Sequence, residues 1–161
     1  MQTNTNKQVI LVSRPSGWVT AKNFKLIEAA MPVVNEGQVL IRNQWLSLDP
    51  YMRGRISDAK SYAQSVNVGE LMVGGTVGEV IESKSPQFKV GDTVLAATGW
   101  QLFAAMNAEQ VLKINTSQVR ASAYLGILGM PGITAWRGLM EICEPKAGET
   151  RSEERRVGKE C

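Results

Sequence analysis

The chain has 161 residues, of which 43% are apolar and 20% are charged, and its formal net charge is +3. These values are typical of one ordinary globular core and argue against disorder, and the weak charge excess forms no basic stripe of the kind that binds nucleic acid. The apolar runs fall short of the roughly 20 residues that span a bilayer, and the first residues lack the apolar centre of a secretion signal. We therefore expect a cytoplasmic chain with no nucleic-acid or membrane partner.

The sequence offers few side chains that hold metals. It contains no histidine, and its two cysteines are Cys143 and Cys161. A transition-metal site is therefore not expected, and the Ser-His and Cys-His nucleophile schemes are excluded. Cys143 is interpreted as a small apolar helix residue.

The first 115 or so residues have the pattern of short strands separated by turns. In chain order, strands are predicted at residues 8–13, 24–28, 37–48, 71–82 and 93–97, and two more are predicted on either side of Asn107. The glycines Gly74, Gly75 and Gly78 interrupt the fourth strand, which indicates bulges and tight curvature. This spacing predicts a small β barrel or sandwich. Three tryptophans are expected to pack in its core or at its rim: Trp18, Trp45 and Trp100.

The turn after the longest strand carries candidate functional residues. Asp49-Pro50 ends that strand and is expected to place Tyr51 at the barrel rim, facing a cleft. A phenol there offers an apolar face and one hydroxyl. Arg53 and Arg55 follow, and two readings stay open: they bridge to carboxylates or solvent, or one of them pins the loop against a second domain.

After about residue 121, the spacing of apolar residues changes from the alternation of strands to the spacing of helices. The stretch SAYLGILGMPGITAWRGLMEIC, from residue 122, predicts a short helix before Gly129 and a longer one after it. Pro131 suits the first turn, and Ile133 and Trp136 recur at helical spacing, with Trp136 expected to be a core residue. Residues 151–161, RSEERRVGKEC, cannot pack as a buried strand and are expected to be disordered.

Four of these segments together resemble a known family. LSLDPYMRGR, VGGTVGEV, KVGDTV and LGMPGITAW are similar to the medium-chain dehydrogenase/reductase superfamily, in its zinc-independent branch of alkenal/one oxidoreductases, prostaglandin reductases and double-bond reductases. The resemblance implies a mainly β fold with C-terminal helices. Residues 1–121 would form a GroES-like, partly open barrel that carries the substrate site. Residues 122–150 would be connecting helices that lead to a Rossmann domain which this sequence lacks, and residues 151–161 a tail outside the family pattern.

The same resemblance implies a reaction. Its members transfer a hydride from NADP(H) to the C=C bond of α,β-unsaturated ketones and aldehydes, without metal, and full-length relatives are expected to be homodimers. Tyr51 would line the substrate pocket, and Met130, Gly132 and Thr134 would border the nicotinamide. The alternative for Thr134 is an ordinary first-turn hydroxyl.

The chain is accordingly expected to be an N-terminal fragment that binds the cofactor weakly and is inactive by itself. Its helix from Pro131 to Cys143 should expose an apolar face. A non-catalytic β-barrel interaction module remains the alternative.

Overall fold

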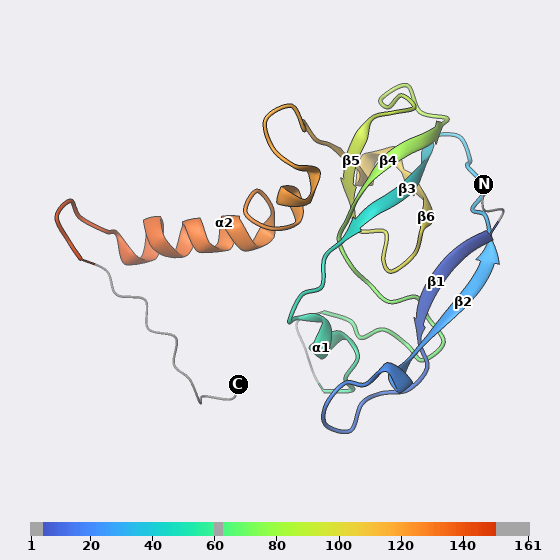
Figure 1. The fold of residues 1–161 in the computed structure, drawn as a ribbon, viewed down its shortest axis with the longest axis horizontal. Helices are drawn as coiled ribbons and strands as arrows, with labels where there is room; N and C mark the ends of the chain where they lie inside the picture. Colours follow the sequence, from blue (N-terminus) through green and yellow to red (C-terminus); the bar gives the residue numbers. More distant parts are fainter. Residues whose placement is uncertain (1–4, 60–62, 151–161) are drawn as a thin grey trace.

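The computed structural model describes residues 5–59 and 63–150, so the prediction for residues 151–161 lies outside the described part. Its strands form two antiparallel sheets (Figure 1). The smaller sheet pairs β1 (Thr5–Leu11) with β2 (Phe24–Ala30). The larger has the order β6-β3-β4-β5-β7, made of β3 (Gln38–Leu46), β4 (Thr76–Ser83), β5 (Thr93–Ala96), β6 (Phe103–Asn107) and β7 (Leu112–Lys113).

Backbone hydrogen bonds join the two sheets without closing a barrel. The amide of Val9 in β1 donates to the carbonyl of Trp100 at 2.9 Å, and the amide of Met72 donates to the carbonyl of Val9 at 3.0 Å. Isolated bridges of β1 with Leu71 and Gln101 accompany these bonds. The predicted mainly β, partly open barrel is thus confirmed.

Each sheet has its own apolar core. The larger sheet encloses one cluster, and the β1–β2 ribbon covers a second that includes Leu11, Ile56 and Met72. Burial of such side chains away from water is the main stabilising term of a domain this size. The first cluster consists of Val39, Ile41, Val80, Phe88, Val94, Ala96, Ala108 and Val111.

A polar side chain at the junction of the sheets is fully buried. Asn6 of β1 is 0% exposed, and its amide donates to Gln101 Oε1 at 3.0 Å and to the carbonyl of Phe103 at 2.8 Å. Its side-chain oxygen accepts from the amide of Phe103 at 3.0 Å. All three bonds cross from the ribbon to the segment that enters β6, so Asn6 fixes how the sheets meet.

The predicted strand at 71–82 is partly wrong, because regular pairing begins only at Thr76. Residues 71–75 instead cross from the ribbon to the larger sheet. The expected irregularity is present, since the β3–β4 register shifts between Leu40 and Ile41 and again between Asn43 and Trp45. Such bulges bend a strand and strengthen its twist.

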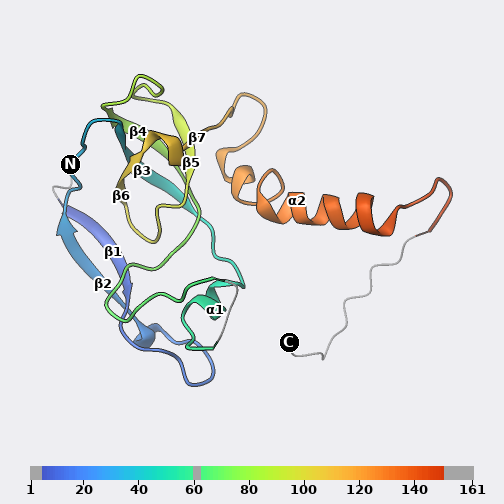
Figure 2. The same cartoon turned by 180° about the vertical axis from the view of Figure 1, so that it is seen from behind.

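The helical segment leaves the sheets. The 3₁₀ turn η3 (Ala121–Leu125) lies beside β3 and β4, and α2 (Met130–Arg137) follows and runs on into the π-helical η4 (Gly138–Cys143). Figures 1 and 2 show α2 pointing away from both sheets. The short helix before Gly129 and the longer one after it are confirmed. The domain boundary at 121/122 stays a prediction, and η3 straddles it.

The predicted apolar exposure on this segment is also found. Ile133 is 63% and Trp136 60% exposed, so Trp136 is not a core residue of this chain, contrary to expectation. Cys143 is likewise exposed. Sequence periodicity identified the apolar residues of α2 but not whether anything covers them.

Stability should depend on pH through Asp92, in the turn before β5. Lys113 of β7 binds its Oδ1 at 2.6 Å, and the amide of Lys89 donates to its Oδ2 at 2.9 Å. The bond from Lys113, followed by that from the Lys89 amide, lowers the pKa of Asp92. A carboxyl whose pKa is lower in the folded state stabilises the fold above its unfolded pKa of about 4, and this contribution is lost as pH falls through the folded pKa.

Asp92→Asn should therefore lower the free energy of unfolding at pH 7 by about 0.5–1 kcal/mol, a modest value because Lys113 is largely in solvent. Urea titrations between about pH 7 and pH 3 should show the difference shrinking below about pH 4. Glu36→Gln, at an exposed turn, is the control for loss of one charge. A difference independent of pH would contradict the assigned pairing.

Candidate functional site

Tyr51 lies where the chain leaves β3 and enters α1 (Met52–Arg55), a single turn of helix. The amides of Met52 and Arg53 donate to the carbonyls of Asp49 and Pro50 at 3.0 and 3.1 Å, which closes the turn. Met52 and Ile56 are buried, so α1 is anchored to the ribbon side of the core. Tyr51 precedes this anchored turn and is 43% exposed.

Arg53 ties α1 to a distant loop. Its guanidinium donates to the carbonyl of Gly17 at 3.1 Å, across 36 positions of sequence. This partner is a backbone carbonyl of the same domain, so the structure gives Arg53 a role in holding a loop. Arg55 differs, because its Nε is buried and has no hydrogen-bond partner within the described residues.

The three residues expected at the nicotinamide occupy the first turns of α2. Met130 is 79% exposed, and the hydroxyl of Thr134 donates to the carbonyl of Met130 at 2.8 Å. The amide of Gly132 donates to the carbonyl of Gly126 at 3.1 Å, and a side chain at Gly132 would run into the carbonyl of Ile127. Thr134 keeps an exposed oxygen that can accept a bond from an amide, whereas the Gly132 amide is already engaged.

Tyr51 and α2 are not brought together in this chain. In Figures 1 and 2, α1 lies beneath the larger sheet and α2 extends to one side of it. An enzyme part, unlike a binding module, needs Tyr51, Met130 and Thr134 to converge on one cleft, and the geometry of the chain alone gives this convergence no support. The assignments of Tyr51, Met130, Gly132 and Thr134 stay predictions.

Gly74 borders an occupied space, whereas a Cβ at Gly75 would meet only Leu125, at an ordinary 3.5 Å. A side chain added to Gly74 would place its Cβ 2.9 Å from Leu46 Cδ1 and 3.2 Å from Nε1 of Trp100. Trp100 itself stacks on Phe24, with ring centroids 5.6 Å apart. Among the described residues, no three cysteine, aspartate or glutamate side chains gather as metal ligands.

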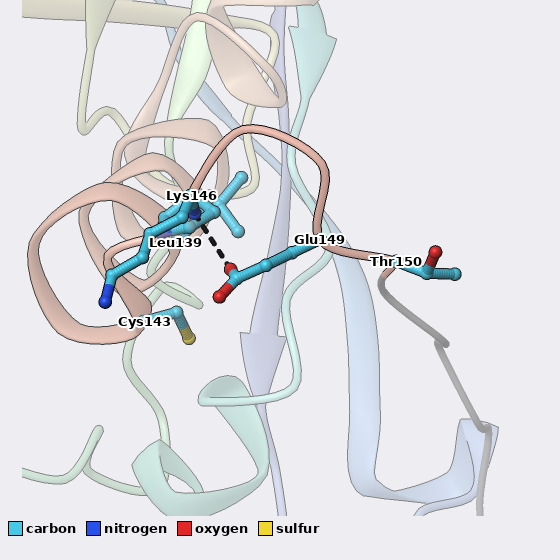
Figure 3. Close-up of a pocket in the computed structure, with 6 residues that line it drawn as sticks. Leu139, Cys143, Lys146, Glu149 and Thr150 are labelled. Carbon is cyan, nitrogen blue, oxygen red and sulfur yellow. Dashed lines mark hydrogen bonds between the residues drawn. The ribbon is translucent and has the colours of Figure 1, made fainter.

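A hollow of about 530 Å³ lies in the helical segment (Figure 3). The amide of Lys146 donates to Glu149 Oε2 at 2.8 Å across it. None of the residues predicted to bind substrate or cofactor lines it. Its walls are Leu139, Cys143, Pro145, Lys146, Glu149 and Thr150.

Comparison with known proteins decides the family. The model of the N-terminal domain of oxidoreductase matches residues 7–114. The chain belongs to this family. It is 46% identical to the NADPH-dependent curcumin reductase of Escherichia coli (strain K12) over 149 residues, which cover 92% of the chain and 43% of the relative. It is 40% identical to the NADP(+)-dependent 2-alkenal reductase of Nicotiana tabacum, covering 91% and 44%.

A solved structure agrees with these relatives. CurA from Vibrio vulnificus, determined in complex with NADPH, is 48% identical and superposes with a TM-score of 0.82 over 89% of this chain and 42% of that one. The resemblance to the N-terminal part of the alkenal/one oxidoreductases is thus confirmed. The chain spans somewhat less than half the length of the relatives it matches.

Sequence reasoning missed the contacts that assemble the site region. The Gly17–Arg53 bond and the Asn6 network join positions far apart in sequence, and no local pattern encodes them. Trp18, which follows the turn RPSG, is 94% exposed. The expectation that Trp18 packs in the core or at the rim is wrong. Across the described residues no helix is long and apolar enough to span a membrane.

Proposed function

We propose that this chain is the substrate-binding part of an NADP(H)-dependent oxidoreductase that reduces the C=C bond of α,β-unsaturated ketones and aldehydes. The observation that carries the proposal is the 46% identity, sustained over 92% of the chain, to a relative named as an NADPH-dependent reductase. When bound, the dinucleotide would supply the hydride. The tasks left to the chain are to bind the enone, to orient it and to stabilise the charge that develops on its oxygen.

Tyr51 is proposed as the group that meets the substrate. It is 43% exposed at an anchored turn, and its hydroxyl can donate to a carbonyl oxygen while its ring contacts the apolar chain. Thr134 is proposed to accept a bond from the nicotinamide carboxamide through its exposed hydroxyl oxygen, next to Met130 and Gly132. The homodimer expected of full-length relatives, the cytoplasmic location and the absence of other partners stay predictions.

Two measurements test the proposal. Joining residues 7–150 to the remaining part of the Escherichia coli curcumin reductase should give an enzyme that oxidises NADPH when an enone is added. The chain by itself should not, because no glycine-rich strand-to-helix turn that holds a pyrophosphate occurs in its sequence. NADPH oxidation by the chain alone would contradict the predicted inactivity, and an inactive but folded fusion would contradict the proposed function.

Tyr51→Phe gives the second measurement. Loss of the hydroxyl should weaken binding of the aliphatic enone mesityl oxide to the unfused chain about three- to tenfold, the usual range for one hydrogen bond. Tyr124→Phe is the matched control, since that hydroxyl donates to the carbonyl of Asn115 at 2.7 Å. If the unchanged chain binds no enone, the result contradicts the proposed substrate site and favours the alternative of a non-catalytic barrel.

A further inference from the structure

The loop between β1 and β2 presents an unusually exposed aromatic side chain. We call residues 12–20 the Trp18 loop. Trp18 is 94% exposed, and Val19 beside it is 40% exposed. An indole exposed to this extent offers both its apolar face and its N–H group to a ligand.

The Trp18 loop is fixed at its base. Asn23 is 7% exposed, and its side-chain amide donates to Ser13 Oγ at 3.0 Å, while its carbonyl accepts from the amide of Val12 at 2.8 Å. These bonds hold the first residues of the loop against the start of β2. The loop therefore leaves the ribbon in a defined direction.

The loop is also fixed near its tip, and there its partner is the segment of α1. Arg53 donates to the carbonyl of Gly17, the residue before Trp18, at 3.1 Å. Arg14 forms an ion pair with Asp58, just after α1. Figures 1 and 2 agree in placing this loop next to α1. Two arginine links thus hold the base of Trp18 beside the turn that carries Tyr51.

We propose that the Trp18 loop forms a wall of the substrate site and that Trp18 selects flat, conjugated enones by stacking on them, with Arg53 as the positioning residue. This inference rests on the proposed function, because it takes the site to be at Tyr51. Trp18 directly follows Gly17, and Tyr51 lies two positions before Arg53, so the Arg53–Gly17 bond brings the two aromatic residues into the same part of the molecule. The proposal takes one extended substrate to contact both. A planar aryl ring conjugated with the enone gains from such a face, whereas a small aliphatic enone has little to stack.

The test uses the ¹⁵N-labelled chain and the indole N–H signals of its four tryptophans. The aryl enone benzylideneacetone should shift the Trp18 signal in a saturable titration and leave the Trp136 signal unchanged. The Trp18 signal is assigned by its loss in Trp18→Leu. Dissociation constants of all variants are read from the backbone amide signal of Gly54, in α1, so that they do not depend on the indole itself.

Trp18→Leu should weaken benzylideneacetone binding about three- to tenfold, the range for loss of an aromatic pair, and change mesityl oxide binding less than twofold. Trp18→Phe should restore most of the loss. Arg53→Ala should weaken benzylideneacetone binding severalfold although Trp18 is intact. Trp136→Leu, which alters another exposed tryptophan, is the control and should change neither constant.

The outcomes separate the two proposals. If both enones bind and Trp18→Leu affects neither, Trp18 has no role in selection and the site at Tyr51 stands. If no enone binds the unchanged chain, the site fails and the inference about Trp18 fails with it. Self-association that Trp18→Leu abolishes, with enone binding unchanged, would assign the indole to a contact with a second copy and overturn the inference.

Discussion

Replacing Gly78 by valine should destabilise the chain by about 3 kcal/mol or more, a large part of the 5–15 kcal/mol that a domain typically has. Gly78 lies in β4, where it pairs with Asn43 of β3 on one side and with Val94 of β5 on the other. A Cβ at this position would lie 2.5 Å from the carbonyl oxygen of Arg42 and 2.7 Å from Ile41 Cγ2.

The backbone of β3 cannot move away from that Cβ without a large loss of free energy. Arg42 also pairs with Phe103 of β6, so moving its carbonyl would disturb the sheet on both sides. Gly78→Ala should also destabilise the chain, but by less than Gly78→Val does. Gly75→Ala is the matched control, because its Cβ would meet only Leu125, at an ordinary 3.5 Å. Urea unfolding measures the three variants, and a Gly78→Val chain within about 0.5 kcal/mol of the original would refute the close approach of β3 and β4.

Asn6→Leu should reduce the free energy of unfolding by about 2–4 kcal/mol, since it removes three hydrogen bonds made by a fully buried side chain. Leucine has a similar volume but offers no polar atom. Phe103 is half-buried, and its amide and carbonyl would lose the bonds that they make with Asn6 at 3.0 and 2.8 Å. Urea titration gives the loss, and faster hydrogen exchange of the Phe103 amide locates it.

The matched control is Asn67→Leu. Asn67 is exposed, and its amide bonds locally to Glu70 at 2.9 Å. This change should cost well under 1 kcal/mol, as exposed substitutions usually do. Equal losses for the two variants would mean that the Asn6 bonds do not hold the ribbon to the larger sheet.

Local sequence patterns predicted the order and type of most elements because each depends on its own residues. The alternation around Val39 and Ile41 specifies β3, and Pro131 together with Ile133 marks the start of α2. The stretch 71–75 was misassigned because its apolar residues serve a crossing between sheets. The alternation of apolar residues cannot distinguish a regular strand from such a crossing segment, since both bury apolar side chains.

Of the candidate residues, only Tyr51 is singled out by a local turn signal, at Asp49-Pro50, and the strand before it already ends at Leu46. Its role at the substrate stays a prediction. The role of Arg53 depends on Gly17, and the exposure of Trp18 depends on how that loop is held. Both are set by three-dimensional contacts. The prediction that Trp136 is a core residue is wrong for a related reason. The periodicity of the sequence shows that one face of α2 is apolar, but it does not show what packs against that face.

The separation of α2 and η4 from the sheets affects how the molecule responds to heat and force. Among the described residues, no backbone hydrogen bond of the strand ladders involves this segment, so its helix can unwind or reorient without breaking a ladder bond of either sheet. The barrel and the outlying helix are then two cooperative units of unequal strength. The orientation of α2 relative to the sheets must therefore be fixed by contacts other than the hydrogen bonds between strands.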